Sequence, residues 1–586
     1  MTKMCRCLLA LMLAMVLLQT GAGAQDEGPA AGLVPADAVF CVEATRPRAI
    51  LDLLTGEEMT EALNALPSYR ELFSAPGFAQ FQLGVSHFEL LLNASWRDAL
   101  KRLTGDGITF ALCPDESVLL IIEAEDEAFL ARFHETLINA VRADAVSKGL
   151  PPSVESAEYM GVTGWSLDGK EAHATVGKRL ILSSTAEGLK RALELRAEAN
   201  GASFASRPDY VKAQRVSGPV PDMRAFASIA PFKQMPGVAQ LLAPNEDNPL
   251  AALFFSGLME AANNANWLWL GLGANEEGLS LRALLDGQVA GQASPAAFAQ
   301  PPTPAEGAMP NLCVPGRIAS LSFYRDLYGF YSGKDALFGE RTSPLIFFEN
   351  MMGIFFTGRD LTSEVLSETR PELRFVVAQE QLDQGSDPDK GQMPAFAAVL
   401  RLRDPEAFGV VVEEAWQKAV GLVNFTSGQQ AQPGLIIDRP IHGGTKYTVA
   451  GLSSAGLDSP NAHHNARPTL AMPGDYVILS STDGLARHLM DALSAEGAGA
   501  PVGGVHSMVE LDGGQLGSIL EANRAVLARN TMVSKGVTEE EAEAEVRVYF
   551  DVASAIECAK LRVGTSNGLT EGCLDIELAL PERQAP

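Results

Sequence analysis

The sequence contains few of the residues that usually mark a catalytic or metal-binding site. Its 586 residues include 8 His and 7 Cys, and no Cys-x-x-Cys or Cys-His spacing typical of a structural zinc site occurs. Basic residues are also scarce, with 45 Lys and Arg against 72 Asp and Glu and a net charge of -27. This excess argues against nucleic acid and anionic lipid headgroups as partners. The sequence therefore predicts no metal, no cofactor and no nucleic-acid ligand.

Long apolar runs are missing from all but the first residues. At the start, Lys3 and Arg6 precede the apolar run Leu8–Leu18, and Ala22–Ala24 has the small-x-small pattern of a cleavage site. These features predict a signal peptide, residues 1–24, and export to the periplasm or out of the cell. An uncleaved membrane anchor is the alternative. Later stretches all fall short of about 18 consecutive apolar residues, so no integral membrane span is expected after signal cleavage.

One segment of the chain occurs twice. Leu180–Thr185 is Leu-Ile-Leu-Ser-Ser-Thr, and Val477–Thr482 is Val-Ile-Leu-Ser-Ser-Thr. Each copy predicts a buried strand, a hydroxyl-rich turn and then an amphipathic helix. Ser184 with Glu187 fits a capping box at the start of the first of these helices. Serines at the end of a strand are typical of nucleophiles, but their repetition favours a structural role.

Other predicted elements recur in the same order, and hydrophobic residues, at 47% of the chain, suffice for large cores. The sequence therefore predicts an α+β fold of two tandem homologous domains, each a mainly antiparallel sheet with helices packed on one face. The predicted organisation is a signal peptide (1–24), a disordered tail (25–33), repeat one (34–286), a Pro/Ala/Gly-rich linker (287–310) and repeat two (311–582).

Three of these motifs together suggest a family. The opening Val34–Ala38 (Val-Pro-Ala-Asp-Ala), the strand 120–126 (Leu-Ile-Ile-Glu-Ala-Glu-Asp) before a helix, and Leu180–Thr185 follow one another in this order. The chain resembles a bacterial family of exported proteins of unknown function with Leu/Val-Pro-Ala-Asp-type opening strands. The resemblance implies an envelope or secreted setting and no known activity, so it gives no functional residues to carry over.

Five cysteines follow the predicted signal peptide. In an exported protein two disulfides are expected, Cys41 with Cys113 between strands and Cys558 with Cys573 across a hairpin, which leaves Cys313 free. The connectivity stays open at this point, because spacing alone does not fix it.

Two glycine-rich patterns resemble catalytic motifs. Gly564–Gly568 fits the G-x-S-x-G elbow, with Ser566 as its nucleophile, but Asn567-Gly568 predicts a hairpin turn rather than a strand-to-helix turn. Gly164–Lys170 fits the outline of a phosphate-binding loop, but Glu171 occupies the position of the required Ser or Thr. Both patterns are interpreted as turns between strands.

Three further sets of polar residues resemble a catalytic or metal-binding site. Ser481, Asp483 and His488 suggest a catalytic triad, but Ala192 stands at the position of His488 in the first copy, so helix capping is favoured. Two loops have carboxylates or histidines without the full ligand spacing of a metal site. Their residues are Asp458, His463 and His464 in one loop and Asp383, Asp387 and Asp389 in the other.

Trp267 and Trp269 alternate with leucines on a predicted strand and therefore point to one face. They form a ligand platform or an interface, or else they pack under a helix, and they are the candidate binding residues. The function predicted from the whole sequence is a non-catalytic binding or scaffold protein of the bacterial envelope, with its ligand site in a cleft between the domains. Its partner would be an envelope or extracellular protein or a small ligand. The alternative is an exported hydrolase whose active site is assembled from distant loops.

Overall fold

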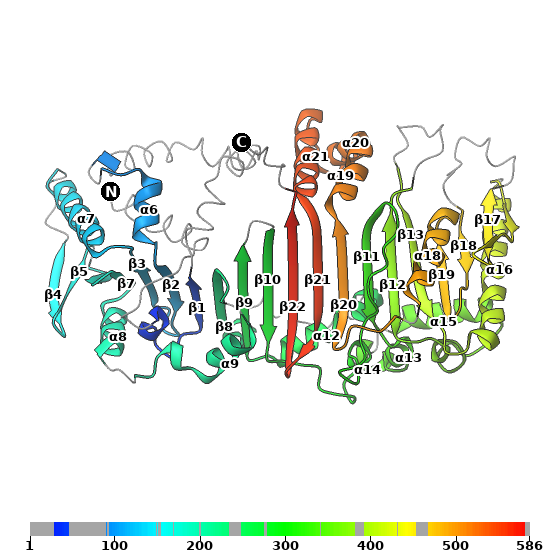
Figure 1. The fold of residues 1–586 in the computed structure, drawn as a ribbon, viewed down its shortest axis with the longest axis horizontal. Helices are drawn as coiled ribbons and strands as arrows, with labels where there is room; N and C mark the ends of the chain where they lie inside the picture. Colours follow the sequence, from blue (N-terminus) through cyan, green and yellow to red (C-terminus); the bar gives the residue numbers. More distant parts are fainter. Residues whose placement is uncertain are drawn as a thin grey trace. The chain divides into compact units, whose positions relative to one another are not determined.

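A computed structural model describes most of the chain (Figure 1). The described residues are 29–45, 89–90, 93–147, 149, 154–167, 169–197, 201–218, 220–233, 248–274, 278–339, 342–380, 392–430, 432–452, 467–497 and 499–579. The chain divides into two compact units: the first is Met1–Met235 with Asn266–Leu284, and the second is Pro236–Ala265 with Leu285–Pro586. Within these described ranges, no helix has the length and apolarity needed to cross a membrane.

The first unit is an antiparallel sheet with helices. Its strands run in the spatial order β9-β8-β1-β2-β3-β7-β6-β5-β4, with β10 beside β9. The strands are β1 (Phe40–Ala44), β2 (Gly107–Leu112), β3 (Val118–Glu123), β4 (Glu155–Tyr159), β5 (Val162–Ser166), β6 (Ala172–Val176), β7 (Arg179–Ser183), β8 (Met223–Ser228), β9 (Trp267–Ala274) and β10 (Gly278–Leu285). The helices are η1 (Ala30–Leu33), α6 (Trp96–Leu103), α7 (Glu127–Ser147), α8 (Ala186–Ala197), η2 (Phe204–Ser206), α9 (Pro208–Val216) and α10 (Ile229–Lys233).

The second unit is built in the same way. Its strands run in the order β22-β21-β20-β11-β12-β13-β19-β18-β17-β14. The strands are β11 (Arg317–Tyr324), β12 (Glu372–Ala378), β13 (Ala395–Arg401), β14 (Leu435–Asp438), β17 (Thr448–Leu452), β18 (Thr469–Ala471), β19 (Tyr476–Ser480), β20 (Val505–Asp512), β21 (Ile556–Ser566) and β22 (Leu569–Leu578), with a small hairpin of β15 (Ile441–His442) and β16 (Thr445–Lys446). The helices are α12 (Pro249–Asn264), η3 (Ala297–Ala299), α13 (Leu327–Ser332), α14 (Lys334–Phe338), α15 (Ser343–Phe355), η4 (Leu361–Val365), η5 (Leu366–Glu368), α16 (Pro405–Gln429), α18 (Asp483–Glu496), α19 (Gly513–Ala522), α20 (Arg524–Lys535) and α21 (Glu539–Ser554).

The strand registers of the two units also correspond. In both, the first strand in sequence lies between the second strand and the strand that follows the strand-to-helix junction. The corresponding pairs are Phe40 with Leu112 and Ala227 in the first unit, and Ala319 with Val377 and Leu511 in the second. The predicted α+β class with a mainly antiparallel sheet is confirmed.

Helices cover both faces of the sheet, not the one face that the sequence suggested. In the second unit Ile478 packs with Leu485 and Leu489 of α18, whereas its neighbour Val477 packs on the opposite face with Phe408 of α16. The central strands are apolar at successive positions because both of their faces are buried. Figure 1 also shows α19, α20 and α21 at one end of strands β20 and β21, and α13, α14 and α15 at the opposite end of their unit.

Two segments expected to lie outside the domains are packed instead. Ala30–Leu33, in the predicted disordered tail, form a 3-10 helix with Leu33 buried. Residues 287–310, the predicted linker, belong to the second unit, where Phe298 lies in the core against Phe330 with ring centroids 5.0 Å apart. Their Pro, Ala and Gly content resembles a linker, but their few large apolar side chains are buried in the core.

The predicted disulfides are absent, because all five described cysteines are free. In the hairpin β21–β22, Cys573 pairs with Arg562, and Cys558 lies four residues further along the strand, roughly 13 Å away at about 3.3 Å per residue. Cys41 pairs with Ala111, so Cys113 is a diagonal neighbour and not a direct one. Strand register, which spacing in the sequence does not reveal, prevents both bridges.

Candidate functional site

The repeated Ser-Ser-Thr segment forms the same junction in both units. In the first, Ser184 Oγ accepts a hydrogen bond from the Val118 backbone N at 2.9 Å, and the Ser184 N donates to the Val118 carbonyl at 3.0 Å. Thr185 Oγ1 then accepts from the Gly188 N at 3.1 Å. Thr185 is therefore the residue that caps α8, and the predicted capping box of Ser184 with Glu187 is wrong by one residue.

The second junction repeats these contacts. Ser481 Oγ accepts from the Phe396 N at 2.9 Å, and the Ser481 N donates to the Phe396 carbonyl at 2.8 Å. Thr482 Oγ1 accepts from the Leu485 N at 3.3 Å and its hydroxyl donates to Glu380 at 2.9 Å. In both units the serine ties two strands together and the threonine caps a helix.

The triad suggested by Ser481, Asp483 and His488 is not assembled. Ser481 is engaged with the neighbouring strand, and His488 is exposed on α18. Asp483 accepts from the Tyr447 hydroxyl at 2.8 Å and lies 3.5 Å from Arg487. Burial, followed by this bond to Asp483, raises the pKa of Tyr447 to about 12. Asp483 is thus hydrogen-bonded to a tyrosine, not to a histidine.

Both glycine-rich patterns are hairpin turns, as interpreted from the sequence. Asn567 and Gly568 have φ values of 50 and 73 degrees and join β21 directly to β22, so no helix follows Ser566. Gly164 lies in β5, paired with Ala174 of β6. The loop residues suggested as weak metal ligands, Asp383, Asp387, Asp389, Asp458, His463 and His464, lie outside the described residues.

The candidate binding residues Trp267 and Trp269 are buried, with 4% and 1% of their surface exposed. The Trp267 ring stacks on Phe226 at a centroid distance of 5.6 Å. Both tryptophans lie on β9 two residues apart and so share a face, as predicted. Their burial matches the packing interpretation, and they offer no exposed platform in this structure.

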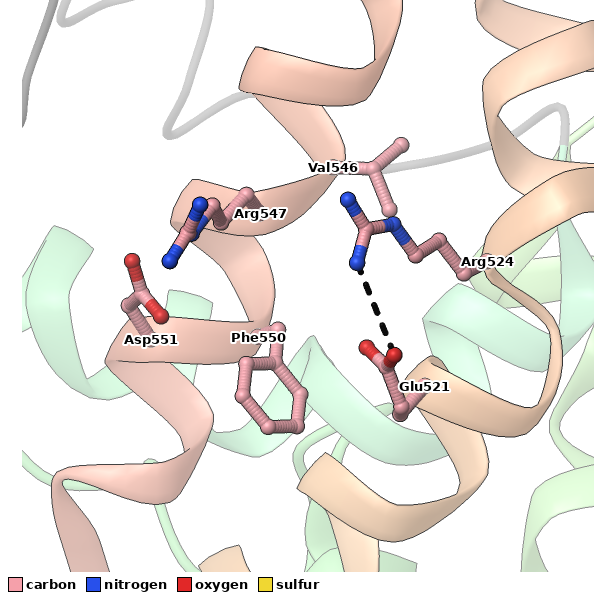
Figure 2. Close-up of a pocket in the computed structure, with 6 residues that line it drawn as sticks. All are labelled: Glu521, Arg524, Val546, Arg547, Phe550 and Asp551. Atoms are coloured by element: carbon pink, nitrogen blue, oxygen red, sulfur yellow. Dashed lines mark ion pairs between the residues drawn. The ribbon is translucent and has the colours of Figure 1, made fainter.

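A hollow of about 320 Å³ lies between α21 and the helices α19 and α20 (Figure 2). Arg524 points across it toward Glu521, with 3.6 Å between Nη1 and Oε1, and its Nη2 lies 3.6 Å from Glu543. The complete lining is Glu521, Arg524, Val546, Arg547, Phe550 and Asp551. Its two cations and two carboxylates balance, and no Ser, Cys or His lines it, so it is a poor candidate for a nucleophilic site.

Each unit also buries charged side chains. In the first, Arg224 Nε donates to Glu43 at 2.8 Å, and the Tyr210 hydroxyl donates to the same carboxylate. In the second, Arg374 Nη1 binds both carboxylate oxygens of Glu496, at 2.8 and 3.0 Å. Each of these ion pairs lies inside one unit and is hydrogen-bonded, so we assign both pairs a role in stabilising the fold.

A histidine pair is buried in the first unit. The Nε2 atoms of His134 and His173 lie 3.1 Å apart, so one ring donates and the other accepts. Burial lowers the pKa of both rings, that of His173 to about 4. The pair is therefore neutral near pH 7 and acts there as a hydrogen-bonded contact beside Trp165, whose ring centroid is 5.5 Å from that of His134.

The most unusual surface of the described chain lies on α15. Leu345 and Met352 of this helix pack into the core of the second unit, which follows the usual amphipathic pattern. The outward side is nevertheless apolar as well: Phe347 is 71% exposed and Ile354 is 68% exposed. Ile346 and Phe348 are also exposed. The outward side of α15 is therefore mainly apolar, although the exposed Asn350 lies between Phe347 and Ile354 along the helix.

Helix α16 continues this pattern. Its inner side packs through Phe408 and Trp416, and large apolar residues are exposed near both of its ends. The two helices are neighbours, because the Phe356 ring that follows α15 stacks on Phe408 at 6.4 Å. We use the term apolar helix surface for the exposed residues Ile346, Phe347, Phe348 and Ile354 of α15 and Val410, Leu422, Val423 and Phe425 of α16.

The sequence contains a signal for this surface that its pattern alone does not distinguish from that of a core helix. Between Ser343 and Phe355 the chain has one ionisable residue, Glu349, and between Ala419 and Gln429 it has none. Apolar helices of this kind are normally buried. Only the structure shows which apolar side chains of these two helices remain exposed to solvent.

Comparisons with known proteins do not assign this chain to a family. No family model and no curated protein matches the chain. Among solved structures, crystal forms IV, III and I of TP0453 are similar at 10% sequence identity, covering 45%, 46% and 45% of this chain and 83%, 82% and 80% of theirs. Their TM-scores are 0.25, 0.25 and 0.23, and a likeness at that level carries no argument about this protein.

Proposed function

We propose that this chain is an exported, non-catalytic binding or scaffold protein of the bacterial envelope that binds through the apolar helix surface of its second unit. The observation that carries the proposal is the exposure of Phe347, Ile354, Val410 and Phe425, each at least 65% exposed. Fully burying one such side chain contributes about 1.5–3 kcal/mol. Phe347 and Ile354 are seven residues apart and therefore share one side of α15. Grouped exposed apolar residues are typical of interaction sites, whereas single ones are ordinary.

The absence of a catalytic role is supported by the strand-to-helix junctions. Ser184 and Ser481 stand where a strand-end nucleophile would, but each accepts a hydrogen bond from a neighbouring strand. Thr185 and Thr482 cap helices. These hydroxyls have structural partners in both units, which favours binding over hydrolysis.

Export is supported by the start of the sequence, where Lys3 and Arg6 precede Leu8–Leu18 and Ala22–Ala24 offers a cleavage pattern. We also propose that the two units descend from one duplicated domain. The same strand order, the corresponding registers and the matching bonds of Ser184 and Ser481 support this origin. Under this proposal, binding was acquired or retained in the second copy.

Site-specific photo-crosslinking in the native envelope fraction tests the binding proposal. A photoreactive phenylalanine derivative in place of Phe347 or Phe425 should give discrete adducts. The same group in place of Val146 on α7 or Val533 on α20, which are also exposed, is the matched control and should not. Equal labelling at all four positions, or none at Phe347 and Phe425, would contradict a binding role for this surface.

A further inference from the structure

Helix α15 buries few residues for its length. Of its 13 residues, all of which the structure describes, Leu345 alone is buried. Helix α18 in the same unit has 14 residues and buries five of them. Met352 and the following Phe356 add partly buried contacts with the same core as Leu345. Because packing of one side supplies most of a helix's stability in a protein, α15 needs further contacts to hold its position.

The end of α15 has a threonine where glycine is usual. The Gly358 N donates to the Gly353 carbonyl at 2.7 Å, which is the bond that closes a Schellman motif. Thr357, just before Gly358, has a φ of 58 degrees and so lies in the left-handed region. This position normally takes glycine, because a Cβ atom makes the conformation costly, most of all in a β-branched residue. Strain of this kind persists only where surrounding contacts hold it.

The side chain of Thr357 bridges α15 to α16. Its hydroxyl donates to Glu414 Oε1 at 3.0 Å and accepts from Lys418 Nζ at 2.5 Å. Lys418 and Glu414 are themselves 2.8 Å apart, so the three groups form a closed set of contacts, for which we use the term latch. The bonds from Lys418 and Thr357 lower the pKa of Glu414, which is therefore ionised near pH 7. A glycine at position 357 would relieve the strain but would make neither bond.

The latch lies within the apolar helix surface. Along α16, Val410, Glu414, Lys418 and Leu422 follow one another at intervals of four residues, so each lies beside the next on the helix. The charged pair therefore separates the exposed Val410 from the exposed Leu422. Because Thr357 contacts α16 at this charged pair, the end of α15 meets α16 between the two apolar parts of its exposed surface.

We infer that Thr357 is a positioning residue of the apolar helix surface, an inference that rests on the proposed function. The latch fixes the end of α15 against α16, so that Phe347 and Ile354 of α15 are presented together with the exposed residues of α16. The stacking of Phe356 on Phe408 joins the same two helices, but an apolar contact is less directional than hydrogen bonds. Loss of the latch should let α15 separate from α16 and weaken binding through Phe347, while α16 keeps its position.

Hydrogen exchange of the full chain tests whether the latch fixes α15. Thr357→Val keeps the β-branched shape and the strained backbone but removes the hydroxyl. Amides of α15 should then exchange about fivefold faster, which corresponds to the loss of one hydrogen bond, whereas those of α18 should not change. Thr357→Ser keeps the hydroxyl and should exchange like the wild type. Gln417→Ala on α16 is the matched control, because Gln417 is exposed and its amide bonds Glu413 of the same helix.

Photo-crosslinking in the native envelope fraction tests the positioning role. In the Thr357→Val background, adducts at Phe347 should decline and adducts at Phe425 should be retained. Unchanged exchange of α15 in Thr357→Val, or equally fast exchange in Thr357→Ser, overturns the latch. Faster exchange with unchanged adducts at Phe347 overturns the positioning role. If the wild type gives no adduct at Phe347, the proposed function fails and the positioning role with it, but the exchange of α15 still decides whether the latch holds the helix.

Discussion

Helices α7 and α16 occupy the same place in their units but have different outer surfaces. Each follows the strand that pairs with the strand of the Ser-Ser-Thr junction, β3 in the first unit and β13 in the second. Their inner sides are alike, with Phe129 of α7 and Phe408 of α16 in the core. The exposed residues of α7 include Glu127, Arg132, Glu135 and Arg142, whereas those of α16 include Val410, Leu422, Val423 and Phe425. The fold constrains the inner side alone, so the exposed residues of the two helices were free to diverge.

The buried polar groups of the two units differ as well. Register places Glu43 of β1 at the position of Ser322 in β11. Glu43 is held by Arg224 from β8, whereas Arg374, across from Ser322, comes from β12 and reaches Glu496. Equivalent backbones thus use different polar partners, and substitutions should affect the units separately.

The largest expected effect comes from Arg325, which is 1% exposed in the second unit. It donates to the carbonyls of Leu253 and Phe254 at 2.9 and 2.7 Å and so ties α12 to the end of β11. Arg325→Leu should lower the free energy of unfolding by about 3–5 kcal/mol, because several carbonyls lose their donor. Hydrogen exchange should show lost protection in β11 and β20 but not in β1–β3.

Arg317→Leu is the control for that experiment. Arg317 pairs with Glu510 at 2.7 Å but both side chains are partly exposed, so the cost should be about 1 kcal/mol or less. Equal losses for Arg325→Leu and Arg317→Leu, or lost protection in β1–β3, would contradict the expectation that the two units respond separately to substitution.

Acid should destabilise both units over different pH ranges. Burial, with a further contribution from Arg325, lowers the pKa of His506 in the second unit to about 3, and burial lowers that of His173 in the first to about 4. An unfolded His takes up a proton near pH 6.5. Because the folded forms bind it only at lower pH, stability falls as pH drops below 6.5, by up to about 1.4 kcal/mol per pH unit for each His.

His506→Gln should make this decline shallower in the second unit and leave the first unchanged, and urea unfolding between pH 7 and pH 4 measures it. The His506 contribution is complete above pH 6.5 and continues to fall to about pH 3, whereas that of His173 levels off near pH 4. An unchanged slope in His506→Gln would show that this ring is not buried in its neutral form.

Substituting the junction threonines should destabilise the protein less than Arg325→Leu does, and by different amounts in the two units. Thr482 is buried, caps α18 and also donates to Glu380, whereas the exposed Thr185 caps α8. Thr482→Ala should cost about 1–2 kcal/mol and Thr185→Ala about 0.5–1 kcal/mol. Thermal unfolding of the two variants measures the difference. A larger loss for Thr185→Ala would reverse the comparison.

The sequence predicted features that depend on local chemistry. The Asn567-Gly568 turn joins two strands as expected, and both Ser-Ser-Thr segments follow a strand and precede a helix. Predictions that depend on long-range register were wrong: the disulfide Cys558–Cys573 and the placement of helices on one face. Nothing in a single sequence reports which residues lie opposite each other across strands.

The candidate surface was missed for a related reason. Phe347 and Leu345 have the same apolar character, and periodicity assigns both to a core. In the structure, Leu345 packs against other helices of its unit, whereas Phe347 remains exposed to solvent. Trp267 and Trp269 illustrate the opposite case, since residues typical of a binding platform proved to be buried.

Fluorine NMR of a tryptophan placed on the apolar helix surface tests most directly the central claim that this surface binds a partner in the envelope. Phe347→Trp and Val146→Trp exchange exposed residues, so each should change stability by less than about 0.5 kcal/mol. With 5-fluorotryptophan incorporated and the native envelope fraction added, the fluorine signal of Phe347→Trp should broaden or shift and that of Val146→Trp should not. Equal changes at the two positions, or none at position 347, would contradict a binding role for this surface.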